Sequence, residues 1–351
     1  MPGTLTGVGA DGRITLAHGG GGSAMRSLID EVFLAAFTQG PSAVQEDQAR
    51  LDLTTLAQAG DRLAFTTDAF VVEPLEFPGG NIGTLAVCGT VNDLAVGGAT
   101  PVALSAAFVL AEGLELALLR RVVEAMARSA AQAGVRIVTG DTKVVPRHAC
   151  DGLFVTTSGV GVIRPEHTIS IAAGQPGDVV LVNGTLGDHG AAILCARGDL
   201  ALQTHLQSDC APLNTLVDTL LRAVPGVHCM RDATRGGVAG VLSELAEASN
   251  VLVTVNEAAL PVHPEVEGVC EILGLDPLFL ANEGKLVAVV PACHAEHALA
   301  AIQSHPLGRN AAIIGTLQAS ASGQGAVHVV NEFGGARVLT MPSGEQLPRI
   351  C

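Results

Sequence analysis

The sequence predicts a mixed α/β (α+β) fold of two domains with a C-terminal tail, and three observations predict it. The 351 residues exceed the usual size of one domain, roughly 100–200 residues. Segments with helical spacing and apolar strand-like segments follow one another without a regular strand–helix repeat. Glycine is frequent, at 42 residues, and its clusters separate the apolar runs, as turns require. We place the units at 1–165, 166–341 and 342–351.

The N-terminal unit mixes helices and strands. Apolar residues with helical spacing predict helices at 23–37, 81–98 and 115–134, the first capped by Ser23 and the last closed by Gly134. Apolar runs predict strands at 61–72, 101–110, 135–145 and 153–163. In the first of these strands, we expect a polar break at 66–68.

The C-terminal unit is expected to begin with a strand, a glycine turn and a helix over 177–194, and to contain a further helix over 235–249. Short strands are predicted at 285–290, 311–317 and 326–331. The final ten residues hold two prolines and one glycine, which predicts a mobile tail. Ten extended residues reach roughly 33–36 Å, enough to carry Cys351 into a cleft.

Composition excludes several classes of function. A net charge of −15 argues against nucleic-acid binding, although an anionic nucleotide can still bind if a divalent cation bridges the like charges. No apolar run is long enough to span a membrane. The eight cysteines are far apart without a CxxC pair, and the first residues do not have the pattern of a secretory leader. We therefore expect reduced thiols and a cytoplasmic protein.

Three aspartates interrupt apolar segments: Asp68, Asp93 and Asp141. Carboxylates beside small residues at strand ends suit Mg²⁺, which takes oxygen ligands and keeps water and phosphate oxygens. Each one alone is equally well explained as a turn or capping residue. Together they predict a magnesium site, because a buried carboxylate without a partner is costly.

Two other residues are candidates for the chemistry of this site. Lys143 lies two residues after Asp141, so on a strand both share one face and the ammonium can neutralise a phosphate; a plain salt bridge is the alternative. Glu283 precedes the glycine that opens a predicted strand, and burial would raise its pKa enough to make it a general base. A surface glutamate in a turn explains it equally well.

Two glycine-rich junctions lead into predicted helices. The segment 18–23 offers free N–H groups for an anion, yet it is neither a Walker A loop nor a dinucleotide fingerprint, and a flexible linker explains it too. A second junction, RDATRGGVAG, carries Arg231, Asp232 and Arg235; its alternative is a structural turn with a local ion pair.

Cys351 is the last residue of the sequence. A prenylation box needs its cysteine four residues from the end, so this is not one. The adjacent terminal carboxylate disfavours the thiolate, which argues against an activated nucleophile. A thiol on a flexible tail is better placed to be modified or carried by other groups, unless it is a chance terminal residue.

Seven segments in this order resemble the HypE family of hydrogenase maturation proteins, within the ATP-binding superfamily of aminoimidazole ribonucleotide synthetase and selenophosphate synthetase. They are HGGGGSAMRSLI, TTDAFVV, VNDLAVGGATP, TGDTKVV, MRDATRGGVAGVLSE, ANEGKL and PRIC. The match covers nearly the whole chain. The final PRIC is the most specific segment, because other branches of the superfamily do not end in this way.

The resemblance implies an aminoimidazole ribonucleotide synthetase-like fold and a homodimer whose N-terminal sheets pair, with ATP sites near the interface. It also implies that a carbamoyltransferase, HypF, loads a carbamoyl group onto Cys351. ATP with Mg²⁺ then drives dehydration of that group to a thiocyanate. The cyanide passes to iron on a scaffold of HypC with HypD, for the nickel–iron site of hydrogenase.

Site roles are carried over from the family by motif. The residues implied to bind ATP and its metal are His18, Gly19, Gly20, Gly21, Gly22, Ser23, Asp68, Asn92, Asp93 and Asp141. Of these, the three aspartates would bind the metal, with Asn92 adding its amide oxygen, and the glycine loop would close over the phosphates. The residues implied in catalysis are Cys351, Lys143 as the phosphate-neutralising cation and Glu283 as the proton acceptor.

Two rival functions remain open at this stage. A related kinase or synthetase would act on a free small molecule and would not need Cys351; the lack of a cysteine in the glycine loop argues against selenophosphate synthetase. A non-catalytic assembly protein would use the tail as a docking peptide or metal-carrying thiol. It would turn over no ATP.

Overall fold

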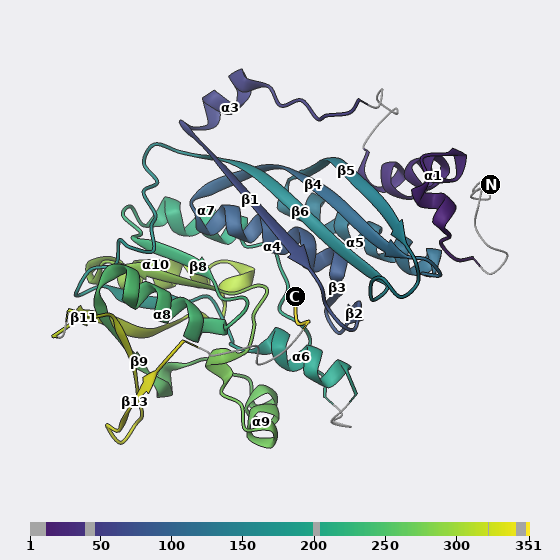
Figure 1. The fold of residues 1–351 in the computed structure, drawn as a ribbon. Coiled ribbons are helices and arrows are strands. Elements are labelled where there is room, and N and C mark those ends of the chain that lie inside the picture. The colour runs from purple at the N-terminus through teal and green to yellow at the C-terminus, as the bar shows by residue number, and fades with distance from the viewer. Residues whose placement is uncertain (1–11, 39–45, 199–203, 322, 342–348) are drawn as a thin grey trace.

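Two β-sheets with separate sets of helices make up the protein (Figure 1). The computed structural model describes residues 12–38, 46–198, 204–321, 323–341 and 349–351. In this part of the chain, no helix is both long and apolar enough to cross a membrane. The mixed α/β fold predicted from the sequence is confirmed.

The first sheet has four strands in the order β1-β6-β4-β5. Their bounds are β1 Arg62–Phe70, β4 Ala99–Ala111, β5 Arg136–Val145 and β6 Leu153–Ile163. Strand β6 is antiparallel to both β1 and β4, whereas β4 and β5 are parallel. A small hairpin of β2 (Glu76–Phe77) and β3 (Gly80–Asn81) follows β1.

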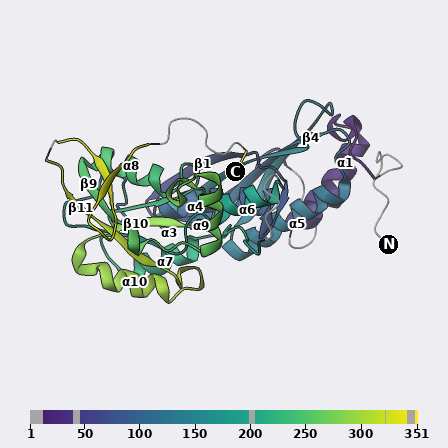
Figure 2. The ribbon, with the colours of Figure 1, turned by 90° about the horizontal axis from the view of Figure 1, so that it is seen from below.

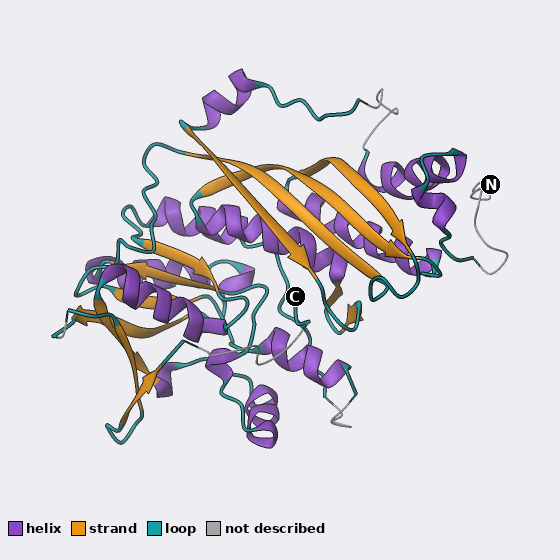
Figure 3. Ribbon diagram, in the orientation of Figure 1, coloured by secondary structure: helices purple, strands orange, loops and turns teal. Residues whose placement is uncertain are grey.

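Among the described residues, the two long helices of this unit cover one face of the sheet. Helix α4 (Ile82–Val96) and helix α5 (Leu116–Ala133) lie beneath it in the view of Figures 1 and 3. Nearly every residue of α4 is buried, because the sheet packs on one side of it and α5 and the second unit on the others. We call the uncovered side the outer face; it exposes the large apolar side chains Leu63, Phe65 and Val109.

The N-terminal segment is mostly helical and lies at the β5 edge of the sheet, with a turn at 20–22 between its first two elements. It consists of η1 (Leu16–Gly19), α1 (Ser23–Leu28), the π-helical η2 (Ile29–Leu34) and α2 (Ala35–Phe37), and α3 (Leu53–Ala59) follows later. Ser23 does not cap this helix, which is a correction to the sequence prediction. The cap position is Gly22, and no side chain caps it.

The second sheet has seven strands in the order β13-β12-β9-β11-β7-β10-β8. Their bounds are β7 Val179–Val182, β8 Cys229–Asp232, β9 Val251–Asn256, β10 Leu286–Val290, β11 Ala312–Ala319, β12 Ala326–Val330 and β13 Ala336–Leu339. Only the β12–β9 pair is parallel among these described strands. Strands β7 and β10 are apolar at every position because helices cover both of their faces.

The helices of the second unit divide between its two faces. Helix α8 (Gly237–Ser249) packs on one face, and α7 (Asn214–Ala223) with α10 (Ala295–Gln303) on the other. Helices α6 (Asp188–Ala196) and α9 (Pro264–Leu273) pack together at the side. Short 3-10 turns are η3 (Glu257–Ala259), η4 (Pro277–Phe279), η5 (Ala292–His294) and η6 (Pro306–Gly308).

The end of the chain returns to the middle of the molecule, beside α6 and α4 (Figures 1 and 2). Ile350 is buried in the core of the first unit, and Cys351 is half-buried against the same core. The prediction of a mobile tail mostly concerns 342–348, which lie outside the described residues. For the last three residues it is wrong, because they are docked against their own chain.

The predicted helices and strands of the N-terminal unit are confirmed, and so are those predicted in the C-terminal unit. One detail is wrong: β1 runs through Thr66 and Asp68 without a break, because these polar residues are on the side that faces α4. The sequence prediction did not include α3, α7, α9, α10, β8, β9 and β13. The boundary near 165 stays a prediction.

Candidate active site around Cys351

A small cavity of about 40 Å³ lies between the two units, and the thiol of Cys351 lines it. The acidic residues around it come from four segments: Asp68 from β1, Asp93 from α4, Asp232 from the end of β8, and Glu283 from the loop before β10. The other lining residues are Ala69, Phe70, Gly89, Thr234 and Arg235. We call Asp68, Asp93, Asp232, Glu283 and Cys351 the inner pocket.

Two of the three aspartates of the inner pocket, Asp68 and Asp232, have a raised pKa. Burial, and then the charge of Asp93, raises the pKa of Asp232 to about 7. The same two causes raise the pKa of Asp68, against a hydrogen bond from Thr90 and the charge of Arg235. Several carboxylates around one cavity, with little opposite charge, favour the approach of a cation.

Glu283 is fixed through its backbone while one side-chain oxygen has no partner. Its N–H donates to Asp209 Oδ1 at 3.0 Å, and its carbonyl accepts from Asn92 Nδ2 at 3.2 Å. Its carboxyl accepts a hydrogen bond from the Cys351 thiol, but Oε1 has no hydrogen-bond partner among the described residues. Burial and the charges of Asp209 and Asp232 raise the pKa of Glu283 well above its usual value.

The docked Cys351 thiol is a weak nucleophile. Burial, and then the negative charge of Glu283, raises the pKa of the thiol well above its usual value, with Arg235 opposing this. Because only the thiolate attacks an acyl donor, this position suits a sulfur that already carries its group.

A buried ion pair supports the loop that carries Glu283. Lys285 Nζ lies 2.8 Å from Asp209 Oδ2, and Gly284 N donates to the same oxygen at 3.1 Å. Although burial alone raises the pKa of Asp209, Lys285 lowers it overall and keeps the carboxylate charged. A side chain at Gly284 would overlap the carbonyl of Asp209, which explains the glycine of the ANEGKL segment.

Asn92 does not point its oxygen at a metal, contrary to the role carried over from the family. Its Oδ1 accepts from Leu213 N at 2.7 Å, and its Nδ2 donates to the carbonyls of Ala211 and Glu283. Both ends of the amide are therefore used in joining α4 to the segment around Glu283. Asn92 positions Glu283 instead.

Asp141 and Lys143 lie elsewhere in the chain, which corrects the predicted grouping with Asp68. They belong to β5, and β1 is at the opposite edge of the sheet, three strand spacings or about 14 Å away. Across the sheet, Asp68 aligns through Thr157 and Ala106 with Gly140, so Asp141 is one residue out of register. Since neighbours along a strand face opposite sides, Asp141 and Lys143 are exposed on the outer face.

The glycine loop packs against β5, the strand that carries Lys143. A side chain at Gly19 would come within 2.7 Å of Val144 N, so the loop packs closely against β5. His18 is fully buried; its Nδ1 accepts from Thr15 N at 3.0 Å, and its Nε2 has no partner among the described residues. Gly21 has a positive φ of 77°, which glycine adopts without strain.

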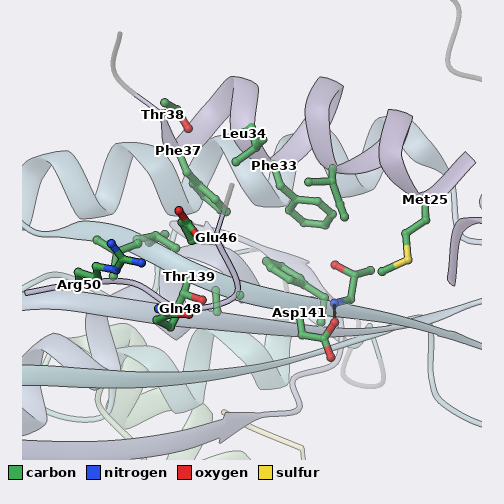
Figure 4. A pocket seen from close by; sticks show the side chains of 17 residues that line it. Met25, Phe33, Leu34, Phe37, Thr38, Glu46, Gln48, Arg50, Thr139 and Asp141 are labelled. Atoms are coloured by element: carbon green, nitrogen blue, oxygen red, sulfur yellow. Dashed lines mark hydrogen bonds between the residues drawn. The ribbon is translucent and has the colours of Figure 1, made fainter. Parts of the chain in front are cut away.

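A larger hollow of about 510 Å³ separates the N-terminal helical segment from β5 (Figure 4). Met25, Phe33 and Phe37 reach down from the helical segment, and Arg50 reaches in from the loop before α3. Asp141 lies at its floor. Its aromatic wall and polar rim suit a planar ligand with charged groups.

The residues of the inner pocket suit a hard cation in their donor type, but they do not form a finished metal site. Among the described residues, no group of three or more His, Cys, Asp or Glu side chains is close enough to hold a metal ion. Carboxylate oxygens are the ligands that Mg²⁺ prefers, and it commonly takes further ligands from water and phosphate. The fit is therefore with a cation that arrives with a nucleotide.

Comparison with known proteins identifies the family. The model of the AIR synthase related protein N-terminal domain matches residues 45–163, and that of the C-terminal domain matches 175–328. The carbamoyl dehydratase HypE of Rhodobacter capsulatus is 60% identical over 341 residues, covering 97% of this chain and 99% of that protein. The chain belongs to the HypE family of carbamoyl dehydratases.

Solved structures of the HypE family have the same fold. A crystal structure of HypE in complex with ATP has a TM-score of 0.90 at 45% identity and covers 96% of this chain and 99% of that one. A crystal structure of a HypE–HypF complex has a TM-score of 0.77 at 46% identity and covers 80% and 90% of the two chains. As a member of the HypE family, this chain is an enzyme.

Sequence reasoning missed two features of the site: two residues that line the cavity, and the ion pair behind the loop of Glu283. Asp232 and Arg235 were noted only as neighbours of a glycine junction, although an aspartate at a strand end is the same signal that singled out Asp68. The Asp209–Lys285 pair gave no signal, because Asp209 lies in a segment without periodicity. Its position became evident only from the fold.

Proposed function

We propose that this enzyme uses ATP to dehydrate an S-carbamoyl group on its own Cys351 to a thiocyanate. One observation carries the proposal: the Cys351 thiol lies against Glu283 at a cavity of about 40 Å³ lined by acidic side chains. A water needs roughly 10–15 Å³ of such space, so the cavity has room for about three small heavy atoms. A carbamoyl group adds three.

The chemistry needs one phosphoryl transfer and the removal of two protons. The carbamoyl oxygen takes the γ-phosphoryl group of ATP, and the nitrogen loses its first proton as ADP departs. The C–O bond then breaks, phosphate leaves with the bonding electrons, and the nitrogen loses its second proton to leave S–C≡N. Phosphorylation makes the oxygen a good leaving group, which a free amide oxygen is not.

Glu283 is the proposed proton acceptor. It contacts the sulfur, and its unpartnered Oε1 is available to a substrate N–H. A raised pKa makes it a stronger base once it is ionised. A cation among the neighbouring aspartates would favour that ionised form.

Asp68, Asp93 and Asp232 are the proposed ligands of Mg²⁺, in place of the set with Asp141. A bound Mg²⁺ would neutralise the charge of the phosphates that it bridges. Arg235, on the rim of the same cavity, adds a positive charge toward the transferred phosphoryl group. ATP binding is supported by the solved complex of a relative with ATP.

We propose a homodimer that pairs through the outer face. Leu63 and Phe65 on this face are 60% and 73% exposed, which is unusual for large apolar side chains on a sheet. In such a dimer, Asp141 and Lys143 of one subunit would serve the nucleotide that reaches the inner pocket of the other. The hollow in Figure 4 is the proposed place for the adenine base.

The proposed partners follow from the family. HypF would load the carbamoyl group, a role supported by the solved HypE–HypF complex of relatives. HypC with HypD would accept the cyanide for the iron of nickel–iron hydrogenase. We also propose a cytoplasmic location; all eight cysteines are free thiols, as that compartment favours.

Intact-mass spectrometry tests the function. The protein is first incubated with HypF, carbamoyl phosphate and MgATP, then purified and given MgATP alone. We expect a gain of one carbamoyl group, followed by an ATP-dependent loss of one water, with neither in Cys351→Ala. Loading without dehydration would leave only a carrier. ATP turnover that persists in Cys351→Ala would indicate an enzyme for a free small molecule.

A further inference from the structure

The last three residues are held by an organised set of contacts that none of the assigned roles includes. Helix α6 supplies two of the contacting residues, His189 in its first turn and Arg197 at its C-terminal cap. The loop after β1 supplies Glu73, and the loop between β5 and β6 supplies Asp151. We call these four residues the tail clamp.

His189 binds the carbonyl of Ile350. The distance from Nε2 to this oxygen is 2.8 Å, and Nδ1 lies 2.8 Å from Ser208 Oγ. A carbonyl only accepts, so Nε2 carries the hydrogen and the Ser208 hydroxyl donates to Nδ1; Ser208 Oγ in turn accepts from Cys210 N. Burial lowers the pKa of His189, which agrees with a neutral ring held in one tautomer.

Arg349 is held through both its backbone and its side chain. Its carbonyl accepts from Arg197 Nη2 at 2.9 Å and from Glu73 N at 3.1 Å. Its guanidinium bridges Glu73 at 2.5 Å and Asp151 at 2.6 Å. It adopts a positive φ of 52°, which is uncommon outside glycine, and these contacts hold the backbone in that conformation.

Ile350 anchors the tail between these polar contacts. Its side chain is 5% exposed and packs in the core of the first unit. The carbonyls of residues 349 and 350 therefore both accept hydrogen bonds from side chains of α6 and its cap, while the sulfur of residue 351 lies against Glu283. The Cys351 sulfur takes no part in any of the clamp contacts.

The clamp is joined to the loop of the proposed base. Gly187, which caps α6 with a φ of 81°, donates from its N–H to Asn282 Oδ1 at 2.7 Å, next to Glu283. A side chain at Gly187 would press on Leu280 and Val266. The position of α6, and with it the docked tail, is thereby fixed relative to Glu283.

We propose that the tail clamp is a binding site for a peptide ending in Arg-Ile-Cys, and that it recognises this peptide independently of the group on the sulfur. The clamp would hold the unloaded and the carbamoyl-loaded tail in the same register. His189 and Arg197 are positioning residues, and Glu73 with Asp151 selects arginine. The proposal rests on the proposed function only in that the docked sulfur is the reacting one.

Thiol reactivity of the full-length protein tests the clamp without any dehydration assay. Iodoacetamide is added in a timed pulse, and alkylation of each cysteine is counted by peptide mass. Cys293 is exposed and lies on the far unit, so it serves as an internal reference. In the unmodified protein we expect Cys351 to react more slowly than Cys293, because docking buries it and raises its pKa.

Two surface variants should release the tail. Arg197→Ala removes a charge-assisted donor, and Arg349→Glu places like charges beside Glu73 and Asp151; each should raise the Cys351 rate about tenfold relative to Cys293. Arg222→Ala, which removes an exposed arginine of α7 with an ion pair to Asp218, is the matched control and should change nothing. The fully buried His189 is left intact because its loss risks unfolding the start of α6.

The decisive test reverses the charges on both sides of the ion pairs of Arg349. Adding Glu73→Arg and Asp151→Arg to Arg349→Glu exchanges the two signs and should return the Cys351 rate close to the original value. Two results would overturn the proposal: Cys351 is alkylated as slowly in both single variants as in the unchanged protein, or it is alkylated as fast in the triple variant as in Arg349→Glu. Either result would show that burial of Ile350 holds the tail without recognition of Arg349. A failed dehydration reaction with this order of rates intact would count against the proposed function and leave the clamp standing.

Discussion

The inner pocket and the outer face both carry acidic residues from the first sheet. They differ in whether the groups needed for the proposed reaction lie together. The inner pocket brings together Asp68, Asp232, Glu283 and the Cys351 sulfur, all within one chain. On the outer face, Asp141 and Lys143 are exposed beside large apolar side chains. The inner pocket is buried and polar, and it has too little positive charge to balance its carboxylates. On the outer face, the ammonium group of Lys143 is exposed to solvent.

This difference follows from the register of one sheet. Asp68 lies on the covered face, and a residue in register with it on β5 would lie there too. Asp141 is displaced by one position, which turns it to the other side. In the proposed function, a single chain would therefore supply the base and the aspartates, while Lys143 would serve the site of a second chain.

The largest expected effect comes from removing the proposed base of the inner pocket. Glu283→Gln should lower the single-turnover rate of dehydration by about 10²–10⁴-fold, because a general base contributes on that order. Loading by HypF should be unchanged, since the thiol docked beside Glu283 is a weak nucleophile and loading is expected on the released tail. Both are read from intact mass, with the exposed Glu296→Gln as control. A full rate in Glu283→Gln would transfer the role to another group.

On the outer face, Lys143→Ala should lower the dehydration rate by about 10²–10³-fold, as expected for the loss of a charge that stabilises the transferred phosphoryl group. The exposed Arg136→Ala on the same strand is its control. Rates are again measured on the loaded protein with MgATP.

Mixing the two variants shows which chain each region serves. If Lys143 acts on the pocket of the partner, a randomly exchanged mixture of Lys143→Ala and Glu283→Gln should regain about a quarter of the original active sites. Half of the dimers would be mixed, and one site in each would be whole. A mixture no more active than its components would place both residues in the same chain's site.

A smaller effect is expected from changing the apolar surface of the outer face. Phe65→Glu buries a charge in the proposed dimer interface and should weaken dimerisation by about 30-fold, the usual size of a hot-spot loss. Analytical ultracentrifugation over a range of concentrations measures this. Ile272→Glu, which is 62% exposed on α9, is the control. An unchanged dimer in Phe65→Glu would exclude this face.

The smallest expected effect is on stability and its pH dependence. The pKa of Asp232 is raised to about 7, so between about pH 4 and pH 7 the folded chain keeps a proton that the unfolded chain has released. The free energy of unfolding therefore falls as pH rises through this window. Asp232→Asn should remove about 1–2 kcal/mol of that fall, because the coupled carboxylates share the proton uptake.

Urea titrations at several pH values check this, without nucleotide or Mg²⁺. The exposed Asp218→Asn should keep the original slope. Adding Mg²⁺ should flatten the pH dependence of the unchanged protein if the aspartates bind it. A steeper fall in Asp232→Asn would contradict the assignment of this carboxyl.

Much of the fold could be predicted, because long segments such as those of α4 and α5 have a sequence pattern that by itself indicates a helix. Short amphipathic helices such as α7 follow unpatterned sequence and were missed. At the site, Asp68 and Asp93 were singled out because they interrupt apolar segments, and Glu283 because it precedes the glycine that opens a strand; the structure brings all three to one cavity, while their roles stay predictions. The grouping of Asp141 with Asp68 within one chain was wrong. Whether the two side chains lie on the same face of the sheet depends on the register of three successive strand pairs, and the sequence of one strand does not determine that register.

The frame around Glu283 has one further consequence. Asp209 accepts a hydrogen bond from its N–H and Asn92 donates one to its carbonyl, so this residue has little freedom to relax, while Oε1 has no partner in the part of the chain that the structure describes. An unsatisfied buried acceptor costs about 1–3 kcal/mol. In the resting enzyme, this cost is therefore borne by one atom, Oε1 of Glu283. In the proposed reaction, a hydrogen bond from a substrate N–H would remove the cost without any backbone rearrangement.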